Sequence, residues 1–202
     1  MSSSEFAALL VLATAMSFTP GPNTTLSTAM GANHGLRHAL PFCLAVPAGW
    51  SLLMLLCGVG LGALLLAAPA LALAIKAVGL AYLLWLAWRL AAGGGGLGTA
   101  RRLDVGFVQG VALQFVNIKA WMLALAMASG WVAPAGDDAA ALARRLAIVI
   151  GVMVVFAFTS NFTYALAGSM LRRWLSVGSR LAWFNRCMAA VLVATALWMA
   201  AA

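Results

Sequence analysis

Two short polar clusters interrupt otherwise apolar segments, and the first is Thr19-Pro20-Gly21-Pro22-Asn23, followed by Thr24. It falls near the middle of an apolar run from Phe6 to Asn33. The two prolines cannot donate backbone hydrogen bonds, and the glycine between them is conformationally free. Hydrocarbon tolerates open backbone only where protein or a water-filled cavity satisfies it. The cluster therefore predicts a helix broken inside a membrane, with a polar binding site formed by Thr19, Gly21, Pro22, Asn23 and Thr24.

A broken helix offers anion chemistry at this point. We expect a second half-helix to begin near Thr24, and its first N–H groups would have no intrahelical partner. These groups carry positive partial charge and suit a carboxylate. Two alternatives remain open: Asn23 or Thr24 could cap the half-helix, or the motif could be a kink that binds no ligand.

The second cluster comprises Gln114, Asn117 and Lys119, within an apolar run over Val105–Val132. Lys119 lies about 13 residues, or roughly 20 Å of helix, from either end of that run. A lysine at the bilayer centre costs on the order of 3 kcal/mol, so it should face the protein interior. The three residues are predicted to bind an anionic group together. The alternative is a structural lysine that caps broken backbone.

Four further polar residues in apolar segments are weaker candidates for a transport pathway: Lys76, Tyr82, Asn161 and Tyr164. Lys76 could equally extend outward to the headgroups. Tyr82 could contact core or lipid, and the other two could serve as interhelical hydrogen-bond partners.

Other chemistry is not supported. The sequence contains no HExxH, no Walker loop and no CxxC pair, so neither an enzyme nor a metal or cofactor site is predicted. The four acidic residues lie at the ends of apolar runs or in loops, which leaves no obvious buried proton relay: Glu5, Asp104, Asp137 and Asp138.

These clusters require a membrane-spanning framework. The 202 residues are 65% hydrophobic and only 8% charged, with mean hydropathy +1.03, whereas soluble domains carry about 25% charged residues. The sequence predicts an all-α integral membrane protein with six spans and a broken first helix. The spans are expected at Phe6–Asn33, Ala39–Leu66, Ala70–Leu90, Val105–Val132, Leu146–Gly168 and Leu181–Ala202.

Arginines set the expected orientation. Six spans place Arg37, Arg89, Arg101, Arg102, Arg172, Arg173, Arg180 and Arg186 on one side. By the positive-inside rule this side is cytoplasmic and both termini lie outside. The net charge of +8 is thereby explained without nucleic acid. A Gly-rich linker over 92–104 divides the single domain into halves of three spans, 1–91 and 105–202, predicted to be inverted repeats.

The motifs resemble the LysE/RhtB family of bacterial amino acid exporters. The resemblance rests on Thr19–Asn23, on the segment from Lys76 to Leu86, and on Phe107-x-x-Gly110 followed by Asn117-x-Lys119. Where the family usually has proline this chain has Ile118, so we expect the fourth helix to be less sharply broken.

The resemblance implies proton-driven efflux of amino acids or close derivatives across the bacterial inner membrane. The absence of a midplane acid favours a neutral cargo. A carrier or channel for another small anion or ion and a non-transporting scaffold remain alternatives. Small residues such as Gly58, Gly60 and Gly62 leave a homo-oligomer possible.

Overall fold

The computed structural model describes residues 1–58, 60, 67–93, 104–135 and 138–201, and all the regular secondary structure in these ranges is helical. Most of the predicted linker and the predicted end of the second span lie outside the described residues. The helices are α1 (Ser3–Phe18), α2 (Pro22–His34), α3 (Leu36–Gly58), α5 (Pro69–Ala92), α6 (Phe107–Val116), α7 (Ile118–Met127), the π-helix η1 (Ala128–Val132), the 3₁₀-helix η2 (Ala133–Ala135), α8 (Ala139–Leu175) and α9 (Arg180–Ala201).

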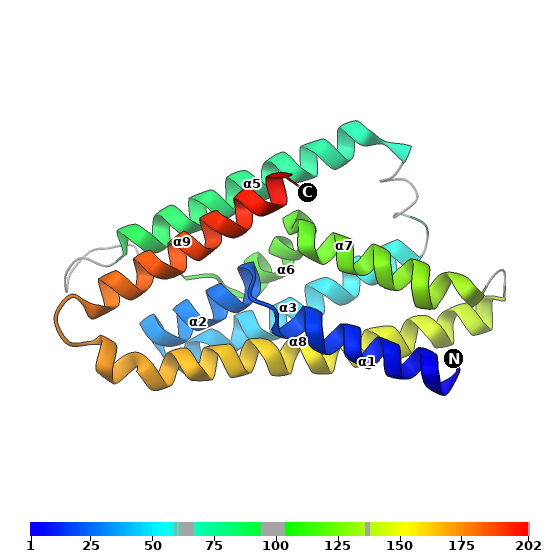
Figure 1. Ribbon diagram of the computed structural model, residues 1–202, viewed down its shortest axis with the longest axis horizontal. Coiled ribbons are helices and arrows are strands. Elements are labelled where there is room, and N and C mark those ends of the chain that lie inside the picture. Colours follow the sequence, from blue (N-terminus) through cyan, green and yellow to red (C-terminus); the bar gives the residue numbers. More distant parts are fainter. Residues whose placement is uncertain (59, 61–66, 94–103, 136–137, 202) are drawn as a thin grey trace.

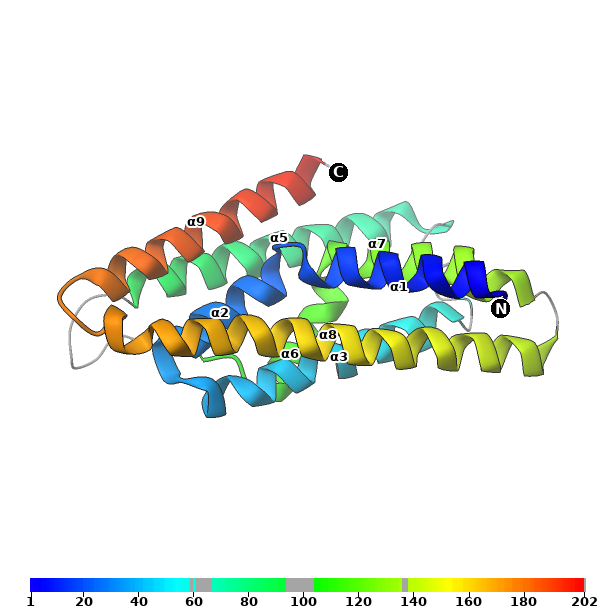
Figure 2. The same ribbon diagram turned by 60° about the horizontal axis from the view of Figure 1, so that its bottom comes forward.

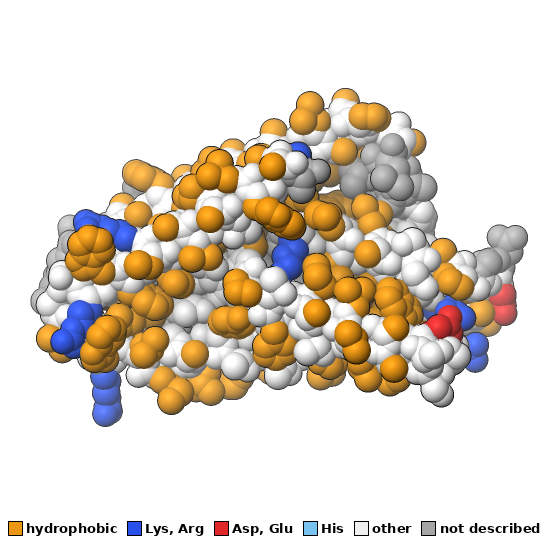
Figure 3. Space-filling model, in the orientation of Figure 1, with side chains coloured by type: hydrophobic (Ala, Val, Ile, Leu, Met, Phe, Trp, Pro, Cys, Tyr) orange, Lys and Arg blue, Asp and Glu red, His pale blue; other side chains and the backbone are white. Residues whose placement is uncertain are grey.

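The helices confirm an all-helical membrane protein of six spans by length and apolar composition. Five helices in the described ranges are long and apolar enough to cross a bilayer, and α1 with α2 forms a sixth span bent by 50°. The helices run lengthwise along an elongated bundle (Figure 1). Hydrophobic side chains cover the middle of the face in Figure 3, and most visible charged side chains lie at its two ends.

The first break follows from its prolines. α1 ends at Phe18, and α2 begins at Pro22, two residues earlier than the sequence predicted. Proline suits the first helical position because the N–H it lacks would have no partner there. Gly21 is the N-cap residue, and the Thr24 hydroxyl takes part in the cap, as one alternative held, by accepting from the Gly21 N–H at 3.0 Å.

The second break needs no proline. Asn117 alone separates α6 from α7 and has an extended backbone, with φ −89° and ψ 103°. Its side-chain oxygen accepts a hydrogen bond from the Lys119 N–H at 3.1 Å. Asparagine is a preferred N-cap, which explains how the helix restarts at Ile118. This break spans one residue, against three in the first.

α2 lies in the interior of the bundle against α8. A β-carbon at Gly31 would overlap the Ala165 carbonyl, and one at Gly168 would overlap the Thr28 carbonyl, so glycine permits the close approach of the two backbones. Two buried polar pairs add specificity: Ser27 with Asn161, and Asn33 with Asn185 of α9. Ten of the 13 residues of α2 are buried.

The remaining helices complete two similar halves. Each half has a broken span followed by two long helices, and the last helices of the halves, α5 and α9, pack together (Figures 1 and 2). This order agrees with the predicted repeat, although the inverted relation of the halves stays a prediction. α8 extends seven residues beyond the expected span at each end, because alanine, leucine and arginine continue a helix past the apolar stretch.

Candidate functional site

A cavity lies where the two broken spans meet. Its walls come from α1, α2, α3, α6, α7 and α8, and its volume is about 60 Å³. All eight residues predicted to bind substrate border it: Thr19, Gly21, Pro22, Asn23, Thr24, Gln114, Asn117 and Lys119. Asn161, a predicted pathway residue, borders it as well. The structure therefore brings together two clusters that lie about a hundred residues apart in the chain.

Lys119 joins the two breaks. Its Nζ donates to the Thr19 carbonyl oxygen at 3.1 Å, so it does cap broken backbone, as one alternative held. An ammonium group has three donors, and this bond uses one of them. Lys119 also borders the cavity, so the capping role and a ligand-binding role are compatible.

A pair of amides connects the same two spans. Asn23 donates to Gln114 at 2.9 Å, and Gln114 returns a hydrogen bond to Asn23 at 3.2 Å. Gln114 is fully buried and also donates to the Gly110 carbonyl oxygen. Because each amide satisfies the other, the pair can remain in an apolar environment and fix the distance between the spans.

The cavity is electropositive. The N-termini of α2 and α7 both contribute residues to its walls, and such helix ends carry positive partial charge. Lys119 is the one charged side chain among the described residues of the lining, which include no aspartate, glutamate or histidine. The site is therefore suited to an anionic group.

Comparison with known proteins identifies the family of this chain. A family model described as LysE type translocator matches residues 14–202. The chain belongs to this family. A protein of Klebsiella pneumoniae named "Cysteine/O-acetylserine efflux protein" is 31% identical over 194 residues, which is 96% of this chain and 95% of the relative.

Two further relatives with the same name come from other bacteria. One, from Escherichia coli O1:K1 / APEC, is 32% identical over 165 residues, covering 80% of each chain. Another, from Salmonella typhimurium, is 35% identical over 111 residues, covering 55% of this chain and 57% of the relative. No solved structure matches the chain.

Three predicted pathway residues of this LysE type translocator lie outside the cavity lining. Tyr164 donates to the Phe18 carbonyl oxygen at 2.9 Å, at the end of α1. Tyr82 stacks on Trp85, with the ring centres 5.5 Å apart. Lys76 is half-buried on α5 and does not border the cavity. A pathway role for these three residues stays a prediction.

The lining also contains residues that the sequence did not single out. They include Ser17 of α1 and Trp50 of α3, together with the apolar residues Val46 and Met153. Residue type alone could not identify Trp50, since the chain has eight tryptophans in apolar segments. Its place in the wall depends on how α3 packs against the broken spans.

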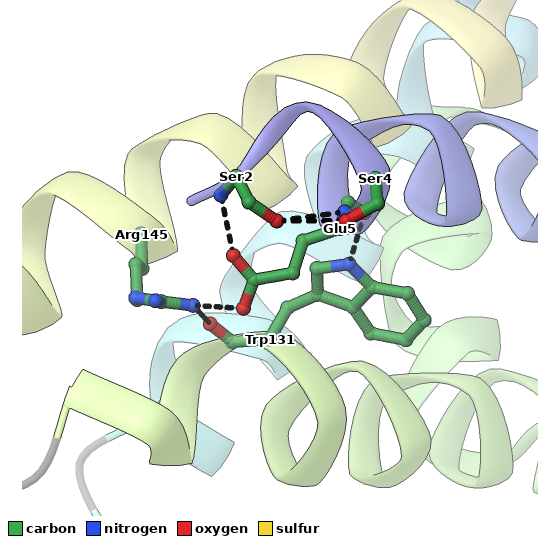
Figure 4. A network of polar contacts seen from close by, with 5 residues as sticks. All are labelled: Ser2, Ser4, Glu5, Trp131 and Arg145. Atoms are coloured by element: carbon green, nitrogen blue, oxygen red, sulfur yellow. Dashed lines mark hydrogen bonds and ion pairs between the residues drawn. The ribbon is translucent and has the colours of Figure 1, made fainter.

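One end of the LysE type fold is fastened by a polar network (Figure 4). Arg145 of α8 donates to the Glu5 carboxylate at 3.3 Å and to the Trp131 carbonyl oxygen at 3.1 Å. The Trp131 indole N–H donates to the Glu5 carbonyl oxygen at 2.8 Å. The start of α1 is thus tied to η1 and α8, at the end that the arginine distribution predicts to be external.

Proposed function

We propose that this protein is a secondary transporter that exports a small neutral amino acid or close derivative across the bacterial inner membrane. The observation that carries the proposal is the meeting of Lys119 with two half-helix N-termini at one small cavity. Membrane transporters commonly bind substrate carboxylates at interrupted helices of this kind. The three relatives are named for cysteine and O-acetylserine efflux, which is small, neutral zwitterionic cargo of the same class.

The cavity chemistry favours a neutral zwitterion. The carboxylate would bind at Lys119 and the helix ends, where charge-assisted hydrogen bonds are strongest. The amide oxygens of Asn117 and Asn161 could accept from the substrate ammonium group. A second cationic group on the substrate would have no carboxylate partner among the described lining residues, which disfavours lysine and arginine as cargo.

The cavity size also favours a small cargo. A bound water needs roughly 10–15 Å³ of the same kind of volume, so about 60 Å³ holds only a handful of water-sized groups. Cysteine and serine have seven non-hydrogen atoms each, whereas larger aromatic amino acids would require the walls to move apart.

We further propose that the proton gradient supplies the energy and that both termini face the outside. The sequence has no nucleotide-binding loop, so transport against a gradient needs an ion gradient as its source. Two features support the orientation: the arginines cluster on one side, and Glu5 and Arg145 lie together at the other.

Transport in proteoliposomes tests the proposal. Vesicles loaded with unlabelled serine or cysteine should accumulate labelled serine in saturable counterflow, and an imposed pH gradient should drive net movement. If a collapsed pH gradient leaves net transport unchanged, proton coupling is wrong. If counterflow is absent but anion conductance is present, the protein is a channel or carrier for another anion.

A further inference from the structure

We propose that Trp50 and Ser17 form a side-chain subsite that selects amino acids with a short hydrogen-bonding side chain, such as a hydroxyl, thiol or ester carbonyl. This inference rests on the proposed function. Lys119 and the helix N-termini would bind the substrate carboxylate, and the subsite would bind the substrate side chain.

The first observation is a buried donor without a partner. Trp50 is 4% exposed, and its indole N–H has no hydrogen-bond partner among the described residues. An indole nitrogen can only donate. A buried polar group left unpaired costs about 1–3 kcal/mol, so native structures rarely keep one unless a ligand or water completes it.

The second observation is an independent unpaired group on another wall. The Ser17 hydroxyl, in the last turn of α1, is buried and also lacks a partner among the described residues. Both Ser17 and Trp50 border the cavity.

The packing of α3 places Trp50 at the wall. At Gly49, α3 approaches α6 so closely that a β-carbon would come within 2.8 Å of Gln114 Cγ and of the Val111 carbonyl oxygen. This close approach fixes the backbone of the next residue, Trp50, which borders the same cavity as Asn23 and Gln114. A donor fixed in this way by backbone contact can discriminate between substrates, because it cannot move to find another partner.

The chemistry then specifies the ligand. The Trp50 N–H needs an acceptor, and the Ser17 hydroxyl can both donate and accept. A substrate hydroxyl, thiol or ester carbonyl can satisfy one or both groups, whereas an alkyl side chain of the same size would leave them unpaired. Sites that hydrogen-bond a substrate group reject analogues that lack it.

The test compares serine with 2-aminobutyrate, which has a methyl group in place of the hydroxyl, as competitors of labelled serine counterflow. In the unaltered protein serine should compete at least about tenfold better. Trp50→Phe keeps the aromatic ring and removes the N–H, and should reduce this preference to about twofold. Ser17→Ala should reduce it in part. Trp198→Phe makes the same change on an exposed position of α9 and should leave the preference intact.

Thermal unfolding supplies a second readout. Trp50→Phe also removes buried indole surface from a packed core and should lower the melting temperature of the ligand-free protein, so the readout is the shift that serine adds in each protein. Added serine should then stabilise the variant less than the unaltered protein. An equal serine-induced shift in the variant and in the unaltered protein would overturn the inference.

Other outcomes separate the two proposals. Equal competition by both compounds in the unaltered protein would overturn the subsite while leaving amino acid transport intact. An unchanged preference in Trp50→Phe would overturn it as well. If neither compound competes and no counterflow occurs, the proposed function fails and the subsite fails with it.

Discussion

The Nζ atom of Lys119 lies 3.1 Å from the carbonyl oxygen of Thr19, which joins the break in the fourth span to the break in the first. This single contact satisfies exposed backbone at the end of α1 and holds a positive charge beside the cavity. The residue is half-buried, so its charge is poorly screened and depends on polar partners for its stability in the membrane. The structural role and the proposed binding role therefore depend on the same side chain.

Removing that charge should abolish export. Lys119→Met keeps the length of the side chain and removes the ammonium group, and we expect at least a tenfold loss of amino acid counterflow, since hydrogen bonds to charged groups contribute about 1.5–3 kcal/mol. Lys76→Met makes the same change outside the cavity lining and separates a role at the cavity from the pathway role predicted for Lys76. Loss of transport in both variants at normal membrane abundance would place Lys76 on the pathway, and unchanged transport in Lys119→Met would remove Lys119 from the mechanism.

Gly21 should tolerate one methyl group and no more. A β-carbon there would lie 3.4 Å from Lys119 Nζ and 3.5 Å from its Cδ, and the backbone φ of −174° strains no residue type. Gly21→Ala should transport nearly normally. Gly21→Val adds two methyl groups, should push Lys119 from Thr19, and should raise the substrate concentration for half-maximal counterflow several-fold. Equal activity of both variants would show that Lys119 has room to move.

The sequence predicted the two polar clusters that meet at the cavity better than it predicted the other residues of the cavity walls. The prolines at 20 and 22 cannot continue a hydrogen-bonded helix, and a lysine deep in an apolar run must face inward, so both clusters follow from local chemistry. The start of α2 at Pro22 was missed because the expected start near Thr24 overlooked the preference of proline for the first helical position.

Long-range packing explains what the sequence did not reveal. Trp50 and Ser17 border the cavity only because α3 and α1 pack beside the broken spans, and no local pattern distinguishes them from other apolar-segment residues. The same holds for Asn33 and Asn185, which lie 152 positions apart and pair as buried amides. The second break was only partly predictable from local sequence. Asparagine at position 117 is a preferred N-cap residue, but it indicates the end of a helix less strongly than a proline does.

The Asn23–Gln114 pair should behave as a unit in stability measurements. Asn23→Leu leaves the fully buried Gln114 amide without that partner and should lower the free energy of unfolding by about 1–3 kcal/mol. Combining it with Gln114→Met replaces both amides by apolar groups and should recover much of the loss. The unaltered protein, the two single variants and the double variant form a double-mutant cycle. Thermal melting in detergent compares the stability of the four proteins. Additive losses would mean that the two amides do not depend on each other.

The close packing of α2 on α8 should make Gly168 intolerant of any side chain. A β-carbon there would overlap the Thr28 carbonyl oxygen and approach the Ala32 nitrogen to 3.0 Å, so Gly168→Ala should destabilise the protein by about 1–3 kcal/mol. Gly151 lies on the same helix, and a β-carbon there would have no atom within 4 Å. Gly151→Ala should therefore leave the stability unchanged or raise it, because alanine has a higher helix propensity than glycine. Melting temperatures of the two variants compare them directly, and a tolerant Gly168 would show that α2 and α8 can separate.

The polar network at the start of α1 should contribute to stability without setting substrate preference. Arg145→Met removes the donor to both Glu5 and the Trp131 carbonyl oxygen, while the Trp131 indole still bonds to α1. Because the Glu5 carboxylate is partly exposed and can recruit water, we expect only a small fall in the melting temperature. Arg144→Met alters an exposed neighbour and should leave the melting temperature unchanged. The serine preference over 2-aminobutyrate should be the same in both variants, and a changed preference in Arg145→Met would mean that this end of the bundle controls the shape of the cavity.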